Sequence, residues 1–376
     1  MSCAGIIFSN LNNRTLSRLT INRTVAAIPF ACRYRLIDFA LSNMVNANIS
    51  NINVVANYNY RSLIEHIGSG KDWDLARRAG GISCISPYQT AYSGNVKVYS
   101  NHLEALRSMS SYISDIKEDY VILSDCDFIA NIDVKSAIES HTKSGAEITF
   151  ITAKCTHDFT SKVPRLMFKT DQNGVIREAV LGSKYQEGFP ELHTQMFIMS
   201  THHLQLLLGE AEAHNYESLT NDIILKNASK GRYRTVRHDG YYAVISSFSD
   251  YFRHSIGLTS DRAAFESLLG RNDRLIYTKV HNSAPVVYSE GANVKNAMIA
   301  DDCVIEGTVE NCILFRGVKI GRGSVVKNSI LFGGTVVGDG CSLNCVVADK
   351  NVYVSDSCKL SGHDTLPFYI AKNRRV

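Results

Sequence analysis

The pattern of apolar and polar residues divides the chain into two regions. Between Ile6 and about Ile256, short β-branched runs alternate with segments whose apolar residues recur at the spacing of an α-helix. We expect strands at residues 52–56, 120–123, 148–153 and 195–199, and helices at residues 37–46, 61–67, 103–113 and 134–142. This alternation is typical of an α/β domain with a mixed, mostly parallel sheet. Ligands of such domains bind at the carboxyl ends of the strands.

From about Val294 the pattern changes to a repeat with an imperfect period of about six residues. Its clearest copies, Val318–Gly323 and Thr335–Gly340, place β-branched residues before Gly-x-Gly. A hexapeptide repeat predicts a left-handed parallel β-helix, in which each coil buries an apolar row and stacks on the next. We therefore expect an α/β domain over residues 1–255, a helix and linker over 256–290, and a β-helix domain over 291–376.

Composition narrows the classes of function. The chain has 376 residues, 45% hydrophobic and 20% charged, which is ordinary for a globular protein. Its net charge is +4 and its Lys and Arg residues are scattered, so we expect neither a nucleic-acid nor a membrane partner. No signal peptide or membrane-spanning run is recognisable, which predicts a cytoplasmic protein. Ten cysteines without a Cys-x-x-Cys pair indicate reduced, mostly buried thiols.

A ten-residue motif is the most specific feature. Tyr34–Asn43 reads YRLIDFALSN and resembles the signature of glucose-1-phosphate adenylyltransferases, which make ADP-glucose for glycogen and starch. Trp73–Ile82 and Asn221–Ile224 also resemble segments of these enzymes. The resemblance implies a Rossmann-like nucleotidyltransferase domain followed by a left-handed β-helix.

The chemistry of that family sets requirements that this chain meets only in part. Glucose 1-phosphate attacks the α-phosphorus of ATP, so the family site neutralises two anions with a glycine-rich loop, a lysine and two magnesium-binding aspartates. Here no glycine lies between Phe8 and Leu16, and Val25 occupies the lysine position. The adenine-contacting segment keeps only its glycine. The resemblance therefore leaves a vestigial nucleotide pocket of Asn12, Asn13, Arg14 and Gly94.

The metal and sugar positions are altered as well. Asp125 remains where the first magnesium ligand belongs, but Val244 replaces the second aspartate, so we expect Asp125 alone to be insufficient for a metal site. We interpret Asp250, six residues further on, as a favourable charge in the first turn of a helix. On the sugar side, we expect Lys184 to be a surface residue, and Met196 replaces a glycine and narrows the pocket.

These losses favour a catalytically silent family member. The profile is most similar to the non-catalytic, regulatory D-type subunit of Gram-positive bacteria, which partners a catalytic subunit. The resemblance implies a hetero-oligomer, a heterotetramer as in relatives, whose catalytic partner holds Mg²⁺ and makes ADP-glucose. No cofactor is expected for the isolated chain, although it can form a homo-oligomer alone. Arg23 is a candidate contact for an anionic effector, because its neighbourhood contributes to the allosteric anion site of relatives.

Two other functions stay open. An active but divergent adenylyltransferase would use Asp125 and Asp127 as a rebuilt carboxylate pair, but residues two apart on a strand face opposite sides. A sensor or scaffold would bind sugar phosphates without catalysis or a catalytic partner. We set aside a β-helix acyltransferase, because its catalytic histidine would lie in the coils, whereas His281 is expected before the β-helix and His363 after it.

Overall fold

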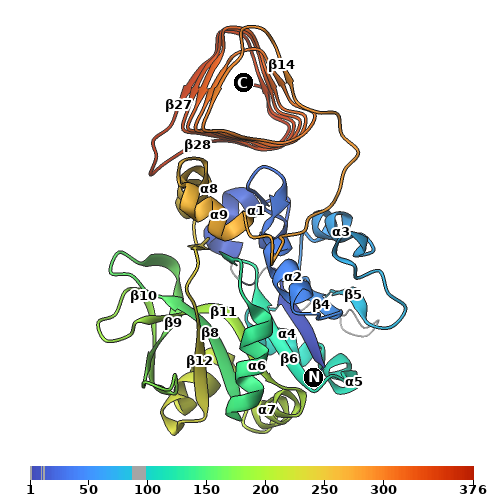
Figure 1. The fold of residues 1–376 in the computed structure, drawn as a ribbon, viewed down its shortest axis with the longest axis vertical. Coiled ribbons are helices and arrows are strands. Elements are labelled where there is room, and N and C mark those ends of the chain that lie inside the picture. The colour runs from blue at the N-terminus through green and yellow to red at the C-terminus, as the bar shows by residue number, and fades with distance from the viewer. Residues whose placement is uncertain (1, 10, 12, 87–98) are drawn as a thin grey trace. The chain divides into compact units, whose positions relative to one another are not determined.

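The computed structural model describes residues 2–9, 11, 13–86 and 99–376, except the side chains of Asn13 and Arg14 (Figure 1). The chain forms two compact units. The first consists of Met1–Ala27, Leu36–Ser246 and Arg271–Tyr277, and the second of Ile28–Arg35, Ser247–Gly270 and Thr278–Val376. The first expected domain boundary, residue 255, falls inside helix α8 (Phe248–Ser260).

The first unit is built on a nine-stranded sheet. In its parallel part, β1 (Cys3–Phe8) pairs with β4 (Asn51–Val55) and β6 (Tyr120–Asp125), and β4 pairs with β5 (Gly81–Ile85). Antiparallel pairing of β11 (Glu191–Ser200) with β6 makes the sheet mixed, as predicted. The other strands are β8 (Ile148–Lys154), β9 (Thr160–Thr170), β10 (Ile176–Lys184) and β12 (Tyr233–His238).

Side chains cap the starts of three helices of this unit. Asn101, Asp133 and Ser200 each accept a hydrogen bond from the backbone N–H three residues on, at the starts of three helices. The helices are α2 (Leu36–Asn46), α3 (Arg61–Ile67), α4 (His102–Ser108), α5 (Ser110–Asp115), α6 (Val134–Ser144) and α7 (Thr201–Ala213). Among the described residues, no helix is long and apolar enough to cross a membrane.

The helix predicted over residues 103–113 is interrupted. Met109, with φ −110° and ψ 21°, separates α4 from α5. Serines flank the break, and Ser108 Oγ donates to the backbone O of Ala105 at 2.6 Å. Serine hydroxyls compete with the backbone for such bonds, which weakens a continuous helix.

Shorter elements connect these helices and strands. They are η1 (Asn13–Leu16), α1 (Ser17–Thr20), η2 (Val25–Ala27), η3 (Lys71–Trp73), β7 (Phe128–Ala130), η4 (Leu219–Leu225), η5 (Ala228–Lys230) and β13 (Tyr242–Val244).

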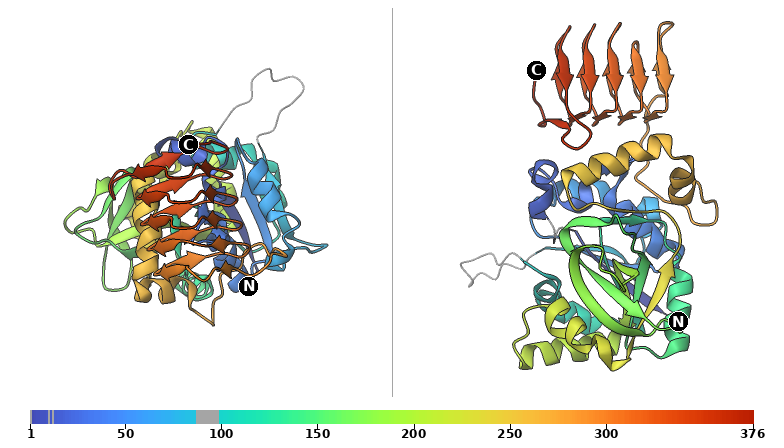
Figure 2. Two further views of the ribbon diagram at one scale, coloured as in Figure 1. Left: turned by 90° about the horizontal axis from the view of Figure 1, so that it is seen from above. Right: turned by 90° about the vertical axis from the view of Figure 1, so that its left-hand side faces the viewer.

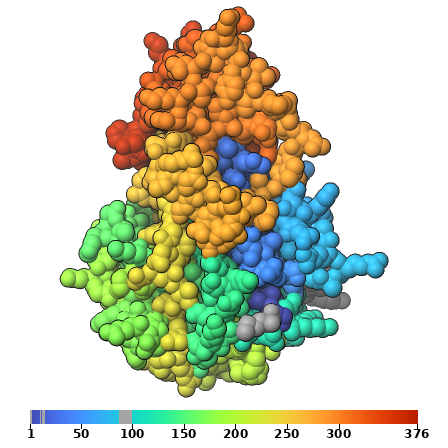
Figure 3. All heavy atoms as spheres, viewed as in Figure 1, coloured from blue at the N-terminus to red at the C-terminus, as the bar shows by residue number. Residues whose placement is uncertain are grey.

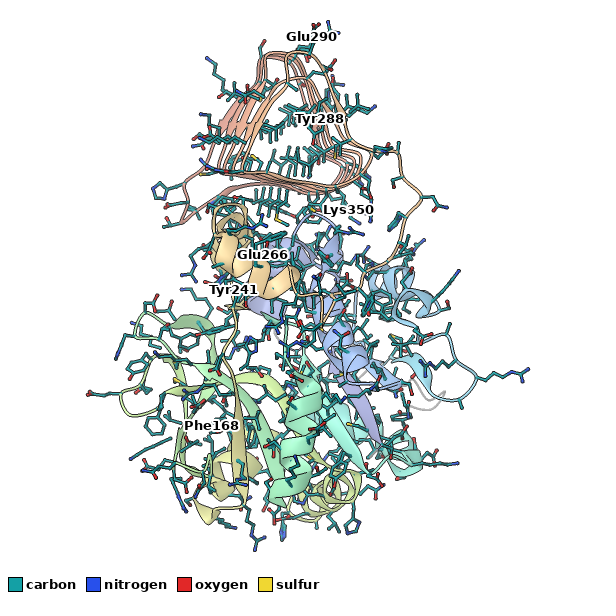
Figure 4. All side chains as sticks on the ribbon, viewed as in Figure 1. Phe168, Tyr241, Glu266, Tyr288, Glu290 and Lys350 are labelled. Atoms are coloured by element: carbon teal, nitrogen blue, oxygen red, sulfur yellow. The ribbon has the colours of Figure 1, made fainter. Side chains whose placement is uncertain are left out.

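An aromatic cluster fills part of the core. The Phe150 ring lies 4.9 Å from that of Phe168, which Figure 4 labels, and 5.7 Å from that of Phe197.

The second unit joins a hairpin and two helices to a β-helix. The hairpin consists of β2 (Pro29–Phe30) and β3 (Tyr34–Arg35), and α9 (Arg262–Leu269) follows α8. Tyr251 of α8 donates its hydroxyl to the backbone O of Pro29 at 2.7 Å, and its ring contacts Phe332 in the β-helix. The hairpin, α8 and the coils are therefore one packed unit.

The β-helix has three parallel five-stranded sheets, one on each side of a triangular coil (Figure 1), and Figure 2 shows the coils stacked. This is the left-handed β-helix architecture that the hexapeptide repeat predicted. The first sheet contains β14 (Val287–Tyr288), β17 (Val304–Ile305), β20 (Lys319–Ile320), β23 (Val336–Val337) and β26 (Tyr353–Val354). The second contains β15 (Asn293–Lys295), β18 (Thr308–Glu310), β21 (Val325–Lys327), β24 (Ser342–Asn344) and β27 (Lys359–Ser361). The third contains β16 (Met298–Ile299), β19 (Ile313–Leu314), β22 (Ile330–Leu331), β25 (Val346–Ala348) and β28 (Phe368–Ile370).

A ladder of asparagines forms one corner of the coils. Asn296, Asn311 and Asn328 have φ values of 48°, 52° and 46°, a left-handed conformation that asparagine tolerates better than most residues. Asn296 Nδ2 donates to Asn311 Oδ1 at 3.2 Å, and Asn311 Nδ2 donates to Asn328 Oδ1 at 3.1 Å. One residue type therefore permits the turn and links successive coils.

The last coil departs from this regularity. A longer connection runs from β27 to β28, and it contains His363. The sequence-based placement of His363 after the β-helix was wrong, because β28 pairs with β25 and closes the coil beyond this histidine. His363 is exposed, and its Nδ1 lies 2.9 Å from Thr365 Oγ1.

Replacing Asn311 by alanine is expected to destabilise the β-helix by about 1–2 kcal/mol, the usual cost of a left-handed conformation for a residue with a Cβ. The substitution also removes two ladder hydrogen bonds. Urea unfolding of the full chain measures the change. Asn311→Gly is the control: it loses the same bonds but keeps the backbone geometry, so it should cost less than Asn311→Ala. Equal stability of all three proteins would contradict this role of the ladder.

Candidate functional site at the carboxyl edge of the sheet

The carboxyl ends of three neighbouring parallel strands meet at one edge of the sheet. The register pairs Phe8, the last residue of β1, with Asp125, the last residue of β6. Beyond β1, the backbone N–H of Ser9 donates to the backbone O of Val55, at the end of β4, at 3.0 Å. The loop that follows β1 therefore starts beside Asp125, at the edge where α/β domains hold ligands.

Asp125 is paired with a histidine that the sequence did not single out. His102 Nε2 lies 2.8 Å from Asp125 Oδ1, and the side chain of Asp125 is 4% exposed. Asn101 caps the helix that His102 begins, and the imidazole makes an edge contact with Phe8. Burial alone would lower the pKa of His102, but the negative charges of Asp125 and then Asp127 outweigh it and raise that pKa above its ordinary value. The two residues therefore form a buried ion pair when His102 is protonated.

Asp127 is paired with an arginine from β9. Arg165 donates from Nη2 to Asp127 Oδ2 at 2.6 Å and from Nη1 to Oδ1 at 3.2 Å. The side chains are 0% and 2% exposed. A bidentate guanidinium neutralises a buried carboxylate well. Arginine within the apolar run Val163–Phe168 is a sequence signal for such a partner, whereas no comparable signal marks His102.

Val244, which replaces the family's second aspartate in the sequence, also lies next to the strand end in the structure. β13 pairs with β7 so that Val244 lies opposite Phe128, in the strand directly beyond Asp125 and Asp127. Val244 is buried, and the backbone N–H of Ile245 donates to the backbone O of Asp127 at 2.8 Å. Valine provides no oxygen for a cation at this position.

These residues do not fit the magnesium site that the family resemblance implies. Mg²⁺ needs several oxygen ligands in near-octahedral geometry. Here Asp125 is bonded to His102 and Asp127 to Arg165, and Val244 replaces the second aspartate of the family. Oδ2 of Asp125 is buried and has no hydrogen-bond partner among the described residues, which leaves one oxygen rather than a two-carboxylate site. Within the described part of the chain, no group of three or more His, Cys, Asp or Glu is arranged to hold a metal ion.

The predicted nucleotide pocket lies largely outside the described residues. Asn12 and Gly94 are not described, and for Asn13 and Arg14 only the backbone is described. That backbone begins the 3-10 helix η1. The role of these four residues as a vestigial pocket therefore stays a prediction.

Two nearby predicted positions are buried. Val25, at the position of the family's lysine, lies in η2 and is 3% exposed. Arg23 is also 3% exposed, and its Nη1 donates to the backbone O of Leu19 at 3.4 Å. Contact of Arg23 with an anionic effector stays a prediction.

The two positions that the sequence assigned to the sugar side, Met196 and Lys184, differ in exposure. Met196 pairs with Ser124, the residue before Asp125, and is 2% exposed, so its side chain occupies the interior next to the strand end. Lys184, at the end of β10, is exposed. In the second unit, Asp250 lies in the first turn of α8, as expected.

The signature helix α2 uses its polar side chains to hold the fold. Asp38 is fully buried, and its Oδ1 lies 2.6 Å from Nε2 of buried His66. Asn43 donates to the backbone O of Ala130 and accepts from the backbone N–H of Ile132, both at 3.0 Å. The motif therefore fixes the segment that follows β7.

Known protein families match both parts of the chain. A family described as nucleotidyl transferase matches residues 11–160, and one described as GlmU-like, C-terminal hexapeptide matches residues 283–366. The glycogen biosynthesis protein GlgD of Bacillus subtilis (strain 168) is 32% identical over 324 residues, 85% of this chain and 81% of that protein. GlgD of Geobacillus stearothermophilus is 34% identical over 327 residues, 86% and 82% of the two chains. The glucose-1-phosphate adenylyltransferase of Geobacillus stearothermophilus is 28% identical over 325 residues, 86% and 83% of the two chains.

Replacing Arg165 by methionine is expected to destabilise the protein by about 3–5 kcal/mol, because it leaves the buried Asp127 carboxylate unpaired. Urea unfolding measures the loss. Lys169→Met on the same strand is the matched control, since the Lys169–Glu178 pair is about half exposed and should contribute about 1 kcal/mol or less. Similar losses in the two variants would rule out a special role for the buried pair.

The contribution of His102 to stability is expected to depend on pH. A histidine whose pKa is raised by folding stabilises the fold fully below its unfolded pKa of about 6.5, and this contribution is lost as the pH rises through the folded value. Asp125, Asp127 and Arg165 are the charged groups that act on it. The difference in unfolding free energy between the wild type and His102→Gln should therefore shrink as the pH increases. A difference independent of pH would contradict a charged His102.

Proposed function

We propose that this chain is a non-catalytic regulatory subunit of ADP-glucose pyrophosphorylase, because it belongs to the glucose-1-phosphate adenylyltransferase family, which includes the glycogen biosynthesis protein GlgD. In this role it acts in glycogen biosynthesis by modulating a catalytic partner. That partner converts ATP and glucose 1-phosphate into ADP-glucose and pyrophosphate. The observation that carries the proposal is the bonding of Asp125 to His102 and of Asp127 to Arg165, each through a side chain of this chain.

The reaction brings two anions together, and catalysis depends on groups that neutralise negative charge as it shifts in the transition state. Val25 offers no positive charge at the lysine position, and Val244 offers no metal ligand. Removing a single electrostatic group of this kind typically lowers kcat by about 10²–10³. Losses at both positions therefore support negligible activity for the isolated chain.

An active enzyme with a rebuilt metal site is the weaker candidate. It would need Asp125 and Asp127 to face one cation together. Each of them is instead paired with its own side-chain cation, in bonds of 2.8 Å and 2.6 Å. Releasing either carboxylate for a metal would leave a partly buried histidine or a fully buried arginine without its partner, which is costly for the arginine in particular.

The proposed partner is a catalytic glucose-1-phosphate adenylyltransferase subunit, which supplies Mg²⁺ in a cytoplasmic heterotetramer. A silent subunit can act there, because an interface that favours the partner's active conformation by a few kcal/mol raises its activity or its effector affinity. The β-helix has a packed apolar core of its own, and we propose it as the domain through which the two subunits assemble. Arg23 remains the proposed effector contact of this subunit.

The purified chain is expected to show negligible synthesis of ADP-glucose from ATP and glucose 1-phosphate with Mg²⁺. When it is added to the catalytic subunit of the same organism, the partner's rate or its substrate and effector saturation curves should change. Radiolabelled product formation measures the first effect, and steady-state kinetics of the mixture measure the second.

Asp125→Ala is the control for residual activity. If the isolated wild type turned over appreciably and Asp125→Ala abolished that turnover in a folded variant, the chain would be an enzyme and the proposal would fail. Size-exclusion chromatography of the mixture tests the partnership itself. Separate elution together with unchanged partner kinetics would favour the sensor hypothesis.

A further inference from the structure

A short segment, Arg271–Tyr277, belongs to the first unit although the chain on both sides of it belongs to the second. It lies between α9 and the chain that enters the β-helix, and it contains no helix or strand. We name it the strap. In Figure 3 the orange part of the chain that contains the strap adjoins the blue part that contains α2. The side chains that hold the strap therefore also hold the chain that leads into the β-helix.

Side chains hold the strap in place of backbone pairing. Within the described part of the chain, no hydrogen bond between backbone groups involves Arg271–Tyr277. Its buried apolar side chain is Ile276, which is 9% exposed, whereas Leu275 and Tyr277 are 47% and 36% exposed. A segment with so little packing and no backbone ladder opens easily. The side chains that bond to its backbone therefore decide how firmly it is held.

Two side chains of the signature helix α2 clip the strap. The backbone N–H of Tyr277 donates to Ser42 Oγ at 2.8 Å, and Ser42 Oγ lies 3.4 Å from the backbone O of Tyr277, to which it donates. Asn46 Nδ2 donates to the backbone O of Leu275 at 3.0 Å. Helix residues at this spacing lie on the same face, so the strap runs along one face of α2.

A third clip joins the strap to the chain that follows the catalytic edge. Asn131 Nδ2 donates to the backbone O of Arg274 at 2.8 Å, and Arg274 Nη1 pairs with Asp133 Oδ2 at 3.0 Å. Asn131 comes directly after β7, the strand that begins beyond Asp127. The strap is therefore bonded, within the first unit, to α2 and to the segment that leaves the altered magnesium position.

We propose that the strap couples the two units mechanically, with Ser42, Asn46 and Asn131 as its attachment points. Both ends of the strap continue into the second unit, and α2 itself starts directly after Arg35 of that unit. The helix and the strap that it clips are thus joined covalently to the same unit. A displacement of that unit acts on α2 at its first residue and again through the clips.

The coupling reaches the former catalytic edge through α2. Asn43 of this helix bonds to the backbone groups of Ala130 and Ile132, on both sides of Asn131. In the proposed function, the β-helix binds the partner, and the strap carries the regulatory effect between that domain and the α/β unit. Coupling of this kind needs one element on which both sides act. This regulatory step rests on the proposed function, whereas the attachment of the strap does not.

Hydrogen exchange of the full chain tests the attachment. In Ser42→Ala the amide of Tyr277 loses its acceptor, so its exchange is expected to accelerate about ten-fold, the effect of losing roughly one net hydrogen bond. Ser144→Ala in α6 is the matched control. Ser144 Oγ likewise donates one bond, to the backbone O of His141, and accepts one, from the backbone N–H of Ala146. The control should leave the exchange of the strap unchanged. Unchanged strap exchange in Ser42→Ala would overturn the attachment.

Limited proteolysis gives a second measurement that does not alter Ser42. Trypsin cleaves after arginine, and Asn131 holds the carbonyl of Arg274 while Asn46 holds that of Leu275. Cleavage of the native chain after Arg274 is expected to be about ten-fold faster in Asn46→Ala, because cleavage follows local opening. Asn227→Ala removes a comparable bond, to the backbone O of Ile223, and should be cleaved as the wild type is. Equal rates in Asn46→Ala and the wild type would contradict the clip.

The double variant Ser42→Ala/Asn46→Ala tests the coupling in the presence of the catalytic subunit of the same organism. It should elute with that subunit in size-exclusion chromatography, yet change the subunit's saturation curves less than the wild type does. An effect equal to that of the wild type, or loss of coelution, would overturn the coupling. If the wild type changes no kinetics of the partner while Ser42→Ala still loosens the strap, the proposed function fails and the attachment stands.

Discussion

A carboxylate that is removed from water needs a compensating charge, and at the end of β6 two such groups, Asp125 and Asp127, lie almost fully buried. The family resemblance implies that a metal ion supplies this charge in the active enzymes to the carboxylate at the position of Asp125. In this chain His102 and Arg165 supply it from α4 and β9. The strand end can therefore stay ordered without a metal ion, and these pairs leave only Oδ2 of Asp125 without a hydrogen-bond partner among the described residues.

The β-helix is held by an unrelated constraint, which explains why its pattern is clear where the catalytic pattern is not. Its corners require left-handed backbone conformations, and Asn296, Asn311 and Asn328 satisfy this while bonding to one another. Apolar rows fill the interior of the coils. None of these requirements involves a nucleotide or a metal, so they persist in a chain whose catalytic residues have changed.

Local patterns predicted most of the fold and part of the site. Hexapeptide spacing and helical periodicity act over a few residues, so the α/β fold and the β-helix were both predictable, whereas the inclusion of Ile28–Arg35 in the same unit as the β-helix was not. The ion pairs were not, because their partners are 23 and 38 residues apart in sequence and meet only through the sheet. The break at Met109 and the place of His363 depend on serine side chains and on a late closing strand, which periodicity does not encode.

The signature helix α2 links these observations. Its motif resembles that of active enzymes, yet the bonds made here by Asp38, Ser42 and Asn43 are internal ones, to His66, to Tyr277 and to the segment after β7. These bonds fix pieces of chain near both edges of the sheet. Selection for a correctly held fold is therefore enough to keep the motif after the catalytic edge has changed.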